Sequence, residues 1–146
     1  MPTIQRVQVV PYSIEQMYDL VNDIVSYTEF VPFCSKSEVL LQTEDELRAS
    51  LTFSKGGLHK SFSTQNRLKP HKIVEMRLLD GPFRQLEGFW RFETVSEGSR
   101  VSLDLEFEFA STLMSIMFGP VFNTVASSLV DAFTKRAHQL YSAKAY

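Results

Sequence analysis

The sequence predicts an α+β fold in which a curved antiparallel sheet wraps around a long C-terminal helix. Residues 99–109 alternate between apolar and polar side chains, and the acidic ones share a face, which is typical of a half-buried strand. The chain then runs from Phe109 to Val130 without a charged residue, which indicates a largely buried helix. The preceding strands are separated by short turns, and such turns join antiparallel neighbours.

The N-terminal part of the chain predicts a strand, a helix and an aromatic turn. Residues 3–10 form the strand, and Pro11 ends it because proline cannot donate a ladder hydrogen bond. Ser13 is placed to cap the helix, and Gln16, three residues later, completes a capping box. Apolar residues then recur at helical spacing, at Ile14, Met17, Leu20, Val21 and Ile24. Residues 27–33 give the aromatic turn.

Six further strands and a long helix complete the predicted fold. Their ranges are 35–42, 46–55, 58–69, 72–80, 83–95 and 99–109, with the helix at 112–142. Alternation marks the inward faces as Leu47, Ala49, Leu51 and Phe53, then Leu58, Phe62 and Leu68, then Val74, Met76 and Leu78, then Leu86, Trp90 and Phe92. Gly88 indicates either a bulge or the close approach of another group, and we favour the bulge. This order of elements is that of a helix-grip fold.

The size and cysteine content indicate one domain in a reducing compartment. We expect a single domain over residues 1–146. Cys34 is the only cysteine, so no intramolecular disulfide can form, and a cytoplasmic location is expected. The N-terminus lacks the pattern of a signal peptide. The uncharged segment from Phe109 to Val130 could span a bilayer by length, but its Ser, Thr and Asn residues favour a buried helix.

The charge is unevenly distributed, although the net charge is only −2. Residues 1–47 carry two basic and eight acidic side chains, residues 48–100 carry ten and five, and residues 101–146 carry three and four. Two interpretations of the basic middle segment remain open. It forms either ordinary solvated strand faces or a surface that meets an anionic partner, such as phosphate headgroups or RNA.

The sequence offers little catalytic or metal-binding chemistry, and we expect the protein not to be an enzyme. His59, His71 and His138 are far apart, and none has a metal-ligand spacing with another His or with Cys34. Cys34 lies in an aromatic turn, where a cysteine is typically a packing residue rather than a nucleophile. No glycine-rich phosphate-binding motif occurs, and we interpret the acidic residues of the last strand as its wet face.

Phenylalanine and methionine are abundant in the expected core, and this composition suits a pocket that adapts to an apolar guest. The candidate lining residues are Leu51, Phe53, Phe62, Met76, Leu78, Trp90, Phe107, Met114, Met117, Phe118, Val121 and Phe122. Candidates for polar anchors are Asn66, Thr64 and Arg91, although alternation places Arg91 on the outer face. The alternative is that these side chains only fill the core.

Short motifs recur along nearly the whole chain in a characteristic order and spacing. They are Val10-Pro11-Tyr12-Ser13, Glu15-Gln16-Met17-Tyr18, Leu20-Val21-Asn22-Asp23, Ser26-Tyr27, Asp80-Gly81-Pro82-Phe83, Leu86-x-Gly88-x-Trp90-x-Phe92, Phe107-Glu108-Phe109 and Phe118-Gly119-x-Val121-Phe122. Together they resemble the coenzyme Q-binding, START-like family of the polyketide cyclase (SRPBCC) superfamily. Within it, the chain is most similar to the bacterial ribosome association toxin branch.

The resemblance implies a START-like fold and two alternative functions. In the respiratory branch the cavity binds ubiquinone or a related isoprenoid lipid and supports quinone use in respiration, without another cofactor. In the toxin branch the protein binds the large ribosomal subunit, blocks its association with the small subunit and so inhibits translation. The chain departs from the toxin motif at Pro120, where a basic residue is expected, and its final helix carries only Lys135, Arg136 and Lys144.

The expected partner is therefore a hydrophobic small molecule, ubiquinone or another isoprenoid lipid. Transient contact with a membrane surface is expected with it, because such a ligand resides in membranes. The large ribosomal subunit is the alternative partner. DNA is not expected.

Overall fold

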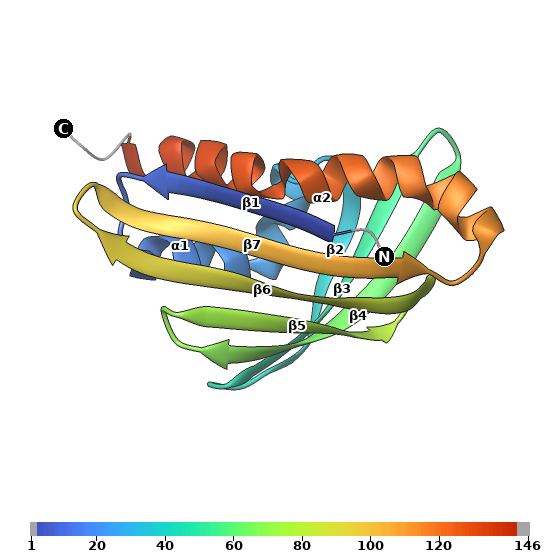
Figure 1. The fold of residues 1–146 in the computed structure, drawn as a ribbon, viewed down its shortest axis with the longest axis horizontal. Coiled ribbons are helices and arrows are strands. Elements are labelled where there is room, and N and C mark those ends of the chain that lie inside the picture. Colours follow the sequence, from blue (N-terminus) through green and yellow to red (C-terminus); the bar gives the residue numbers. More distant parts are fainter. Residues whose placement is uncertain (1–2, 143–146) are drawn as a thin grey trace.

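The computed structural model describes residues 3–142 and confirms the predicted order of elements (Figure 1). The elements are β1 (Thr3–Val10), α1 (Ile14–Asn22), the 3₁₀ helix η1 (Ile24–Glu29), β2 (Cys34–Gln42), β3 (Glu46–Lys55), β4 (Leu58–Lys69), β5 (Ile73–Asp80), β6 (Phe83–Val95), β7 (Gly98–Phe109) and α2 (Thr112–Tyr141). The strand bounds and those of the final helix agree with the predicted ranges to within one residue. The aromatic turn differs, because its first part lies in η1.

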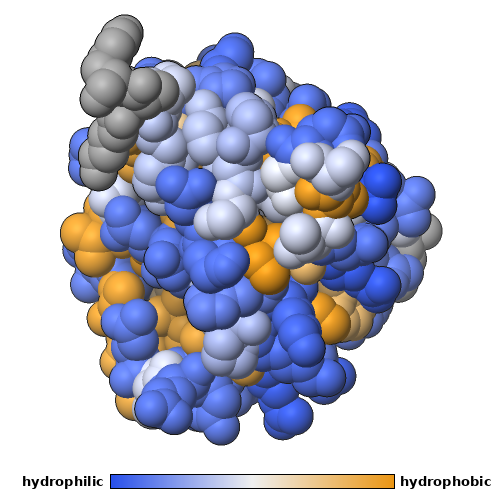
Figure 2. All heavy atoms as spheres, turned by 90° about the vertical axis from the view of Figure 1, so that its left-hand side faces the viewer, coloured by the Kyte–Doolittle hydropathy of each residue, from blue (hydrophilic) through white to orange (hydrophobic). Residues whose placement is uncertain are grey.

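The seven strands form one antiparallel sheet in the order β1-β7-β6-β5-β4-β3-β2. Figure 1 shows that the sheet bends, so that β2, β3 and β4 cross behind β5, β6 and β7 and α2 runs along the hollow side. The β4–β5 and β6–β7 turns share one end of the sheet. Figure 2 shows that this end is mainly hydrophilic, with separate apolar patches. The predicted α+β, helix-grip architecture is confirmed.

α1 begins where the capping motif predicts. The Gln16 backbone N–H donates to Ser13 Oγ at 3.1 Å, and the Ser13 backbone N–H donates to Gln16 Oε1 at 3.0 Å. Both groups would otherwise lack a partner at the start of the helix. Met17, Leu20 and Val21 are buried, so the apolar stripe of α1 faces the core as expected.

α2 is long and apolar enough to cross a membrane by length and composition alone. In the structure it packs on the sheet through one face, whose buried residues are Phe118, Gly119, Val121, Phe122, Val125, Ala126, Val130, Phe133 and Ala137. Their spacing of three and four residues is that of a helix with one apolar face. α2 therefore packs as the interpretation of a buried helix predicts.

Gly88 permits a close approach rather than a bulge. The ladder is continuous on both sides of this residue. A Cβ at this position would lie 2.5 Å from the Asp104 carbonyl oxygen, which is closer than a side chain tolerates. The expectation of a bulge at Gly88 is therefore wrong. Glycine is required because the backbone of β7 passes directly beside β6.

Candidate ligand-binding cavity

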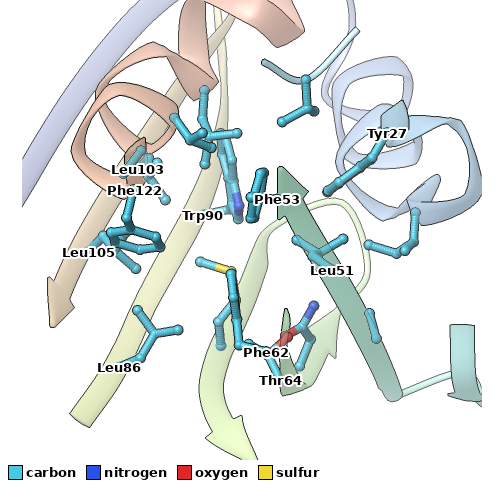
Figure 3. A pocket seen from close by; sticks show the side chains of 18 of the residues that line it. Tyr27, Leu51, Phe53, Phe62, Thr64, Leu86, Trp90, Leu103, Leu105 and Phe122 are labelled. Carbon is cyan, nitrogen blue, oxygen red and sulfur yellow. The ribbon is translucent and has the colours of Figure 1, made fainter. Parts of the chain in front are cut away.

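A cavity of about 80 Å³ lies between the concave face of the sheet, α2 and η1 (Figure 3). Its lining residues are Ile24, Tyr27, Val31, Ala49, Leu51, Phe53, Phe62, Thr64, Asn66, Met76, Leu86, Trp90, Leu103, Leu105, Phe122, Val125, Ala126, Leu129 and Phe133. Most of these side chains are apolar and none is charged. Figure 3 shows Trp90, Leu51 and Phe122 directed toward a common space from β6, β3 and α2. The arrangement suits an uncharged, apolar ligand.

Half of the predicted lining residues reach this cavity. They are Leu51, Phe53, Phe62, Met76, Trp90 and Phe122. Of the three candidate anchors, Thr64 and Asn66 also line the cavity. Arg91 is exposed on the outer face, with its guanidinium 5.4 Å from the centre of the Phe89 ring. The alternation of β4 and β6 therefore correctly predicts that Thr64 and Asn66 face inward and that Arg91 faces outward.

The other half of the predicted set does not line the cavity, so the prediction that these residues line it is wrong. These residues are Leu78, Phe107, Met114, Met117, Phe118 and Val121. Phe107 and Phe118 are fully buried in a cluster of aromatic rings that also contains Phe83, so they are core residues. Met117 is 46% exposed, since it lies on the outer side of α2. The first two turns of α2 therefore cover the aromatic cluster, and the cavity faces the middle of the helix.

Several lining residues were missed by the sequence reasoning. They are Ile24, Tyr27, Val31, Ala49, Leu86, Leu103, Leu105, Val125, Ala126, Leu129 and Phe133. The α2 members continue from Phe122 at steps of three and four residues, and this periodicity could have identified them. The η1 members carry no such signal, because only the packing of η1 against the sheet brings them to the cavity.

Two polar side chains of the lining, Tyr27 and Asn66, differ in their hydrogen bonding. The Tyr27 hydroxyl donates a hydrogen bond to the Val21 carbonyl oxygen. Burial raises the pKa of Tyr27 above its ordinary value, because the charged phenolate is disfavoured away from water. Tyr27 is thus a neutral group whose donor is already used. Asn66 is only 6% exposed, and its Oδ1 has no hydrogen-bond partner within the described residues.

The described residues contain no cluster of His, Cys, Asp and Glu that could hold a metal ion. His138 Nδ1 is hydrogen-bonded to the Tyr12 hydroxyl at 2.6 Å, and His59 Nδ1 to Ser54 Oγ at 2.7 Å. Cys34 is buried, and its thiol contacts the Lys36 carbonyl oxygen at 3.6 Å. Burial raises the pKa of Cys34 to about 11. A thiol with this pKa is a poor nucleophile at neutral pH.

Cys34 should therefore react very slowly with iodoacetamide in the folded protein. A raised pKa removes the reactive thiolate, so we expect labelling at pH 8 to be more than about 100-fold slower than in urea, where the ordinary pKa applies. Labelling should accelerate as the pH approaches 11 while the fold persists. Mass spectrometry of quenched samples measures both rates. Equal rates in the folded and unfolded protein at pH 8 would contradict the raised pKa.

Comparison with known proteins identifies the family. The family described as "Polyketide cyclase / dehydrase and lipid transport" matches residues 10–134, which is most of the chain. The chain belongs to this family. This chain has the same fold as a START superfamily protein from Mycobacterium smegmatis, which superposes with a TM-score of 0.76 at 19% identity, over 94% of this chain and 98% of that one.

Two relatives carry names that concern function. The chain is 45% identical to the ribosome association toxin RatA of Escherichia coli K12, over 99% of this chain and 92% of the relative. It is 34% identical to the mitochondrial coenzyme Q-binding protein COQ10 homolog B of Xenopus laevis, over 92% of this chain and 57% of the relative. The predicted resemblance is therefore confirmed in both branches. The family also includes cyclases, whereas these two relatives are named as a toxin and a binding protein.

Proposed function

We propose that the protein binds ubiquinone or a related isoprenoid lipid in the cavity between α2 and the sheet, without acting as an enzyme. The observation that carries the proposal is the uncharged, mainly apolar lining of this cavity. Membership of a family that includes lipid transport supports it, as does the similarity to a coenzyme Q-binding protein. The cytoplasm remains the expected location.

The cavity is small, about 80 Å³, so we expect its lining to adapt when an isoprenoid ligand enters. Each CH₂ group that leaves water contributes about 0.8 kcal/mol, which offsets the cost of separating apolar surfaces. Met76 and Leu129 line the cavity and are only partly buried, so they can repack around a guest.

Filling the cavity should prevent binding. Ala126 is buried on α2 and lines the cavity, so Ala126→Leu adds three carbon atoms to its interior. We expect the affinity for decylubiquinone, a ubiquinone with a ten-carbon chain, to fall by about tenfold or more, because overpacking costs 1–3 kcal/mol. Quenching of Trp90 fluorescence measures binding, since Trp90 is the only tryptophan and lines the cavity.

The matched control is Ala132→Leu on the same helix. Ala132 is half-buried and does not line the cavity, so this variant should bind decylubiquinone as the wild type does. Equal affinity of Ala126→Leu and the wild type would contradict the cavity as the binding site.

The start of α2 supports transient contact with a membrane, from which such a ligand would be taken. Leu113, Ile116 and Met117 are 64%, 69% and 46% exposed. Neighbouring exposed apolar side chains of this size are typical of surfaces that contact other molecules or membranes. They lie where the uncharged segment of α2 begins, so no charge would have to be desolvated there.

Association with the large ribosomal subunit is the second candidate function. The 45% identity to RatA along nearly the whole chain favours it. The basic excess of residues 48–100 lies mostly on exposed positions, and Lys69 and Lys72 form no ion pair within the described residues. Cations of this kind bind RNA through phosphate contacts. On α2, Lys135 and Arg136 already pair with Asp131 and Glu29, so the sheet is the better candidate surface.

A further inference from the structure

Asn66 is a buried polar side chain whose place in the core has no structural explanation. It lies on the concave face of β4, opposite Leu47 of β3 and Met76 of β5 in the ladder. Neither of these side chains has a hydrogen-bond donor for Asn66 Oδ1. Asn66 is only 6% exposed, and its Oδ1 atom has no hydrogen-bond partner among the described residues.

An unsatisfied amide in the core lowers stability. A buried polar group without a hydrogen-bond partner lowers the free energy of unfolding by about 1–3 kcal/mol, whereas an apolar side chain of similar shape carries no such penalty. The adjoining position of β3 holds an apolar residue, Leu47, which is fully buried. Such a group is expected to have a partner that is not part of the chain.

The surroundings of Asn66 restrict the chemistry of this partner. Asn66 and Thr64 lie on the same face of β4 and both line the cavity, so a ligand inside it can reach them. The lining contains no cation that would neutralise a carboxylate or a phosphate. An ion placed there would be unpaired and buried, which is strongly unfavourable. The unpartnered Oδ1 accepts a hydrogen bond from a donor such as a hydroxyl, and the amide N–H of the same side chain can donate to a carbonyl or hydroxyl oxygen.

We propose that Asn66 anchors the ligand's polar group, and that this group is a neutral oxygen, a carbonyl or a hydroxyl, rather than an ionised head group. This inference rests on the proposed function, because it concerns the ligand of the same cavity. Asn66 holds the ring of a quinone or quinol at β4, and the hydrocarbon chain extends between α2 and the sheet. The amide N–H donates to the carbonyl oxygen of a quinone, and Oδ1 also accepts from the hydroxyl of a quinol, so the quinol binds at least as tightly as the quinone.

Replacement of Asn66 by leucine separates a role in binding from a role in folding. Asn66→Leu should weaken decylubiquinone binding by about five- to tenfold, as loss of one hydrogen bond implies. The same variant should raise the melting temperature by about 2–4 °C, because the unsatisfied amide is gone. A purely structural residue would give the opposite sign, a lower melting temperature. Asn66→Thr, which replaces the carboxamide with one hydroxyl group, should give intermediate affinity and serves if the leucine variant does not fold.

Five probes define the ligand class. Quenching of Trp90 fluorescence measures the binding of decylubiquinone, and competition against decylubiquinone measures the binding of the other four. Decylubiquinol should bind at least as tightly as decylubiquinone, since only its hydroxyl groups can donate to Asn66 Oδ1. Decylbenzene, which has no oxygen, should bind the wild type and Asn66→Leu equally. At pH 7.5 decanoate should compete at least about tenfold less well than 1-decanol, because an ionised group would be buried unpaired. Asn123→Leu, at an exposed position of α2, is the control and should change nothing.

The outcomes distinguish the two proposals. If the wild type binds decylubiquinone and Asn66→Leu binds it equally well, the anchor is wrong while the proposed function stands. Equal competition by decanoate and 1-decanol would overturn the neutral head group. If no probe binds the wild type, the proposed function and the inference both fail.

Discussion

Trp90→Ala is expected to lower the free energy of unfolding by about 3–5 kcal/mol. Trp90 is 2% exposed in the middle of β6, and its ring lies edge-on to Phe133 of α2, with the ring centres 5.2 Å apart. Truncation removes this contact between sheet and helix and enlarges the adjoining cavity, whose walls cannot close fully. Urea unfolding followed by far-ultraviolet circular dichroism measures the change without relying on tryptophan fluorescence.

The matched control for this experiment is Phe89→Ala, one residue earlier on the opposite face of β6. Phe89 is partly exposed and contacts Arg91 rather than α2. We expect a loss of about 1 kcal/mol or less, as is usual for positions outside the core. A loss for Trp90→Ala that is no larger than for Phe89→Ala would contradict the assignment of the inward face of β6.

Replacing Lys69, Lys72 and Arg77 by glutamine should separate the two candidate functions. These side chains are exposed on β4, the β4–β5 turn and β5. If the protein binds large ribosomal subunits, co-sedimentation should fall by about tenfold or more. The slope of the logarithm of the binding constant against the logarithm of the salt concentration should become less steep by roughly 0.7–0.9 for each lost phosphate contact. Decylubiquinone binding should stay within about twofold, since exposed charges outside the lining contribute little to an apolar cavity.

The control variant removes three exposed cations elsewhere, Arg6, Lys36 and Lys135, and so changes the net charge equally. It should retain most co-sedimentation if the β4–β5 surface makes the contacts. Equal losses in both variants would show that only the overall charge matters. If the wild type co-sediments tightly at moderate salt and decylubiquinone does not quench Trp90, ribosome association becomes the preferred function.

Local patterns in the sequence are sufficient to predict the elements of this fold. Alternation, short turns and the Ser13 capping box each depend on residues close together in the chain, so the predicted bounds of the strands and of α2, and the predicted start of α1, agree with the structure to within one residue. The need for glycine at Gly88 has a different origin, because it arises from the position of the β7 backbone beside β6. A local pattern contains the glycine but not the distant group that requires it.

The cavity was only half predictable for the same reason. Strand alternation distinguishes inward from outward side chains, and it correctly predicts Trp90, Asn66 and the exposure of Arg91. The spacing of apolar residues on α2 does not predict which of its inward side chains fill the core and which line the cavity. Phe118 and Phe122 have similar sequence surroundings, yet only Phe122 lines the cavity.

The sequence by itself therefore determined the order of elements, the family and the apolar character of the interior, because these depend on periodicity, capping and motif spacing. The tertiary structure decided which residues enclose the cavity, and it left Asn66 Oδ1 without a hydrogen-bond partner among residues 3–142. The physical reason is that a cavity is the space that remains after side chains from η1, the sheet and α2 have packed. Its position depends on how the sheet bends around the helix, and no single segment contains that information.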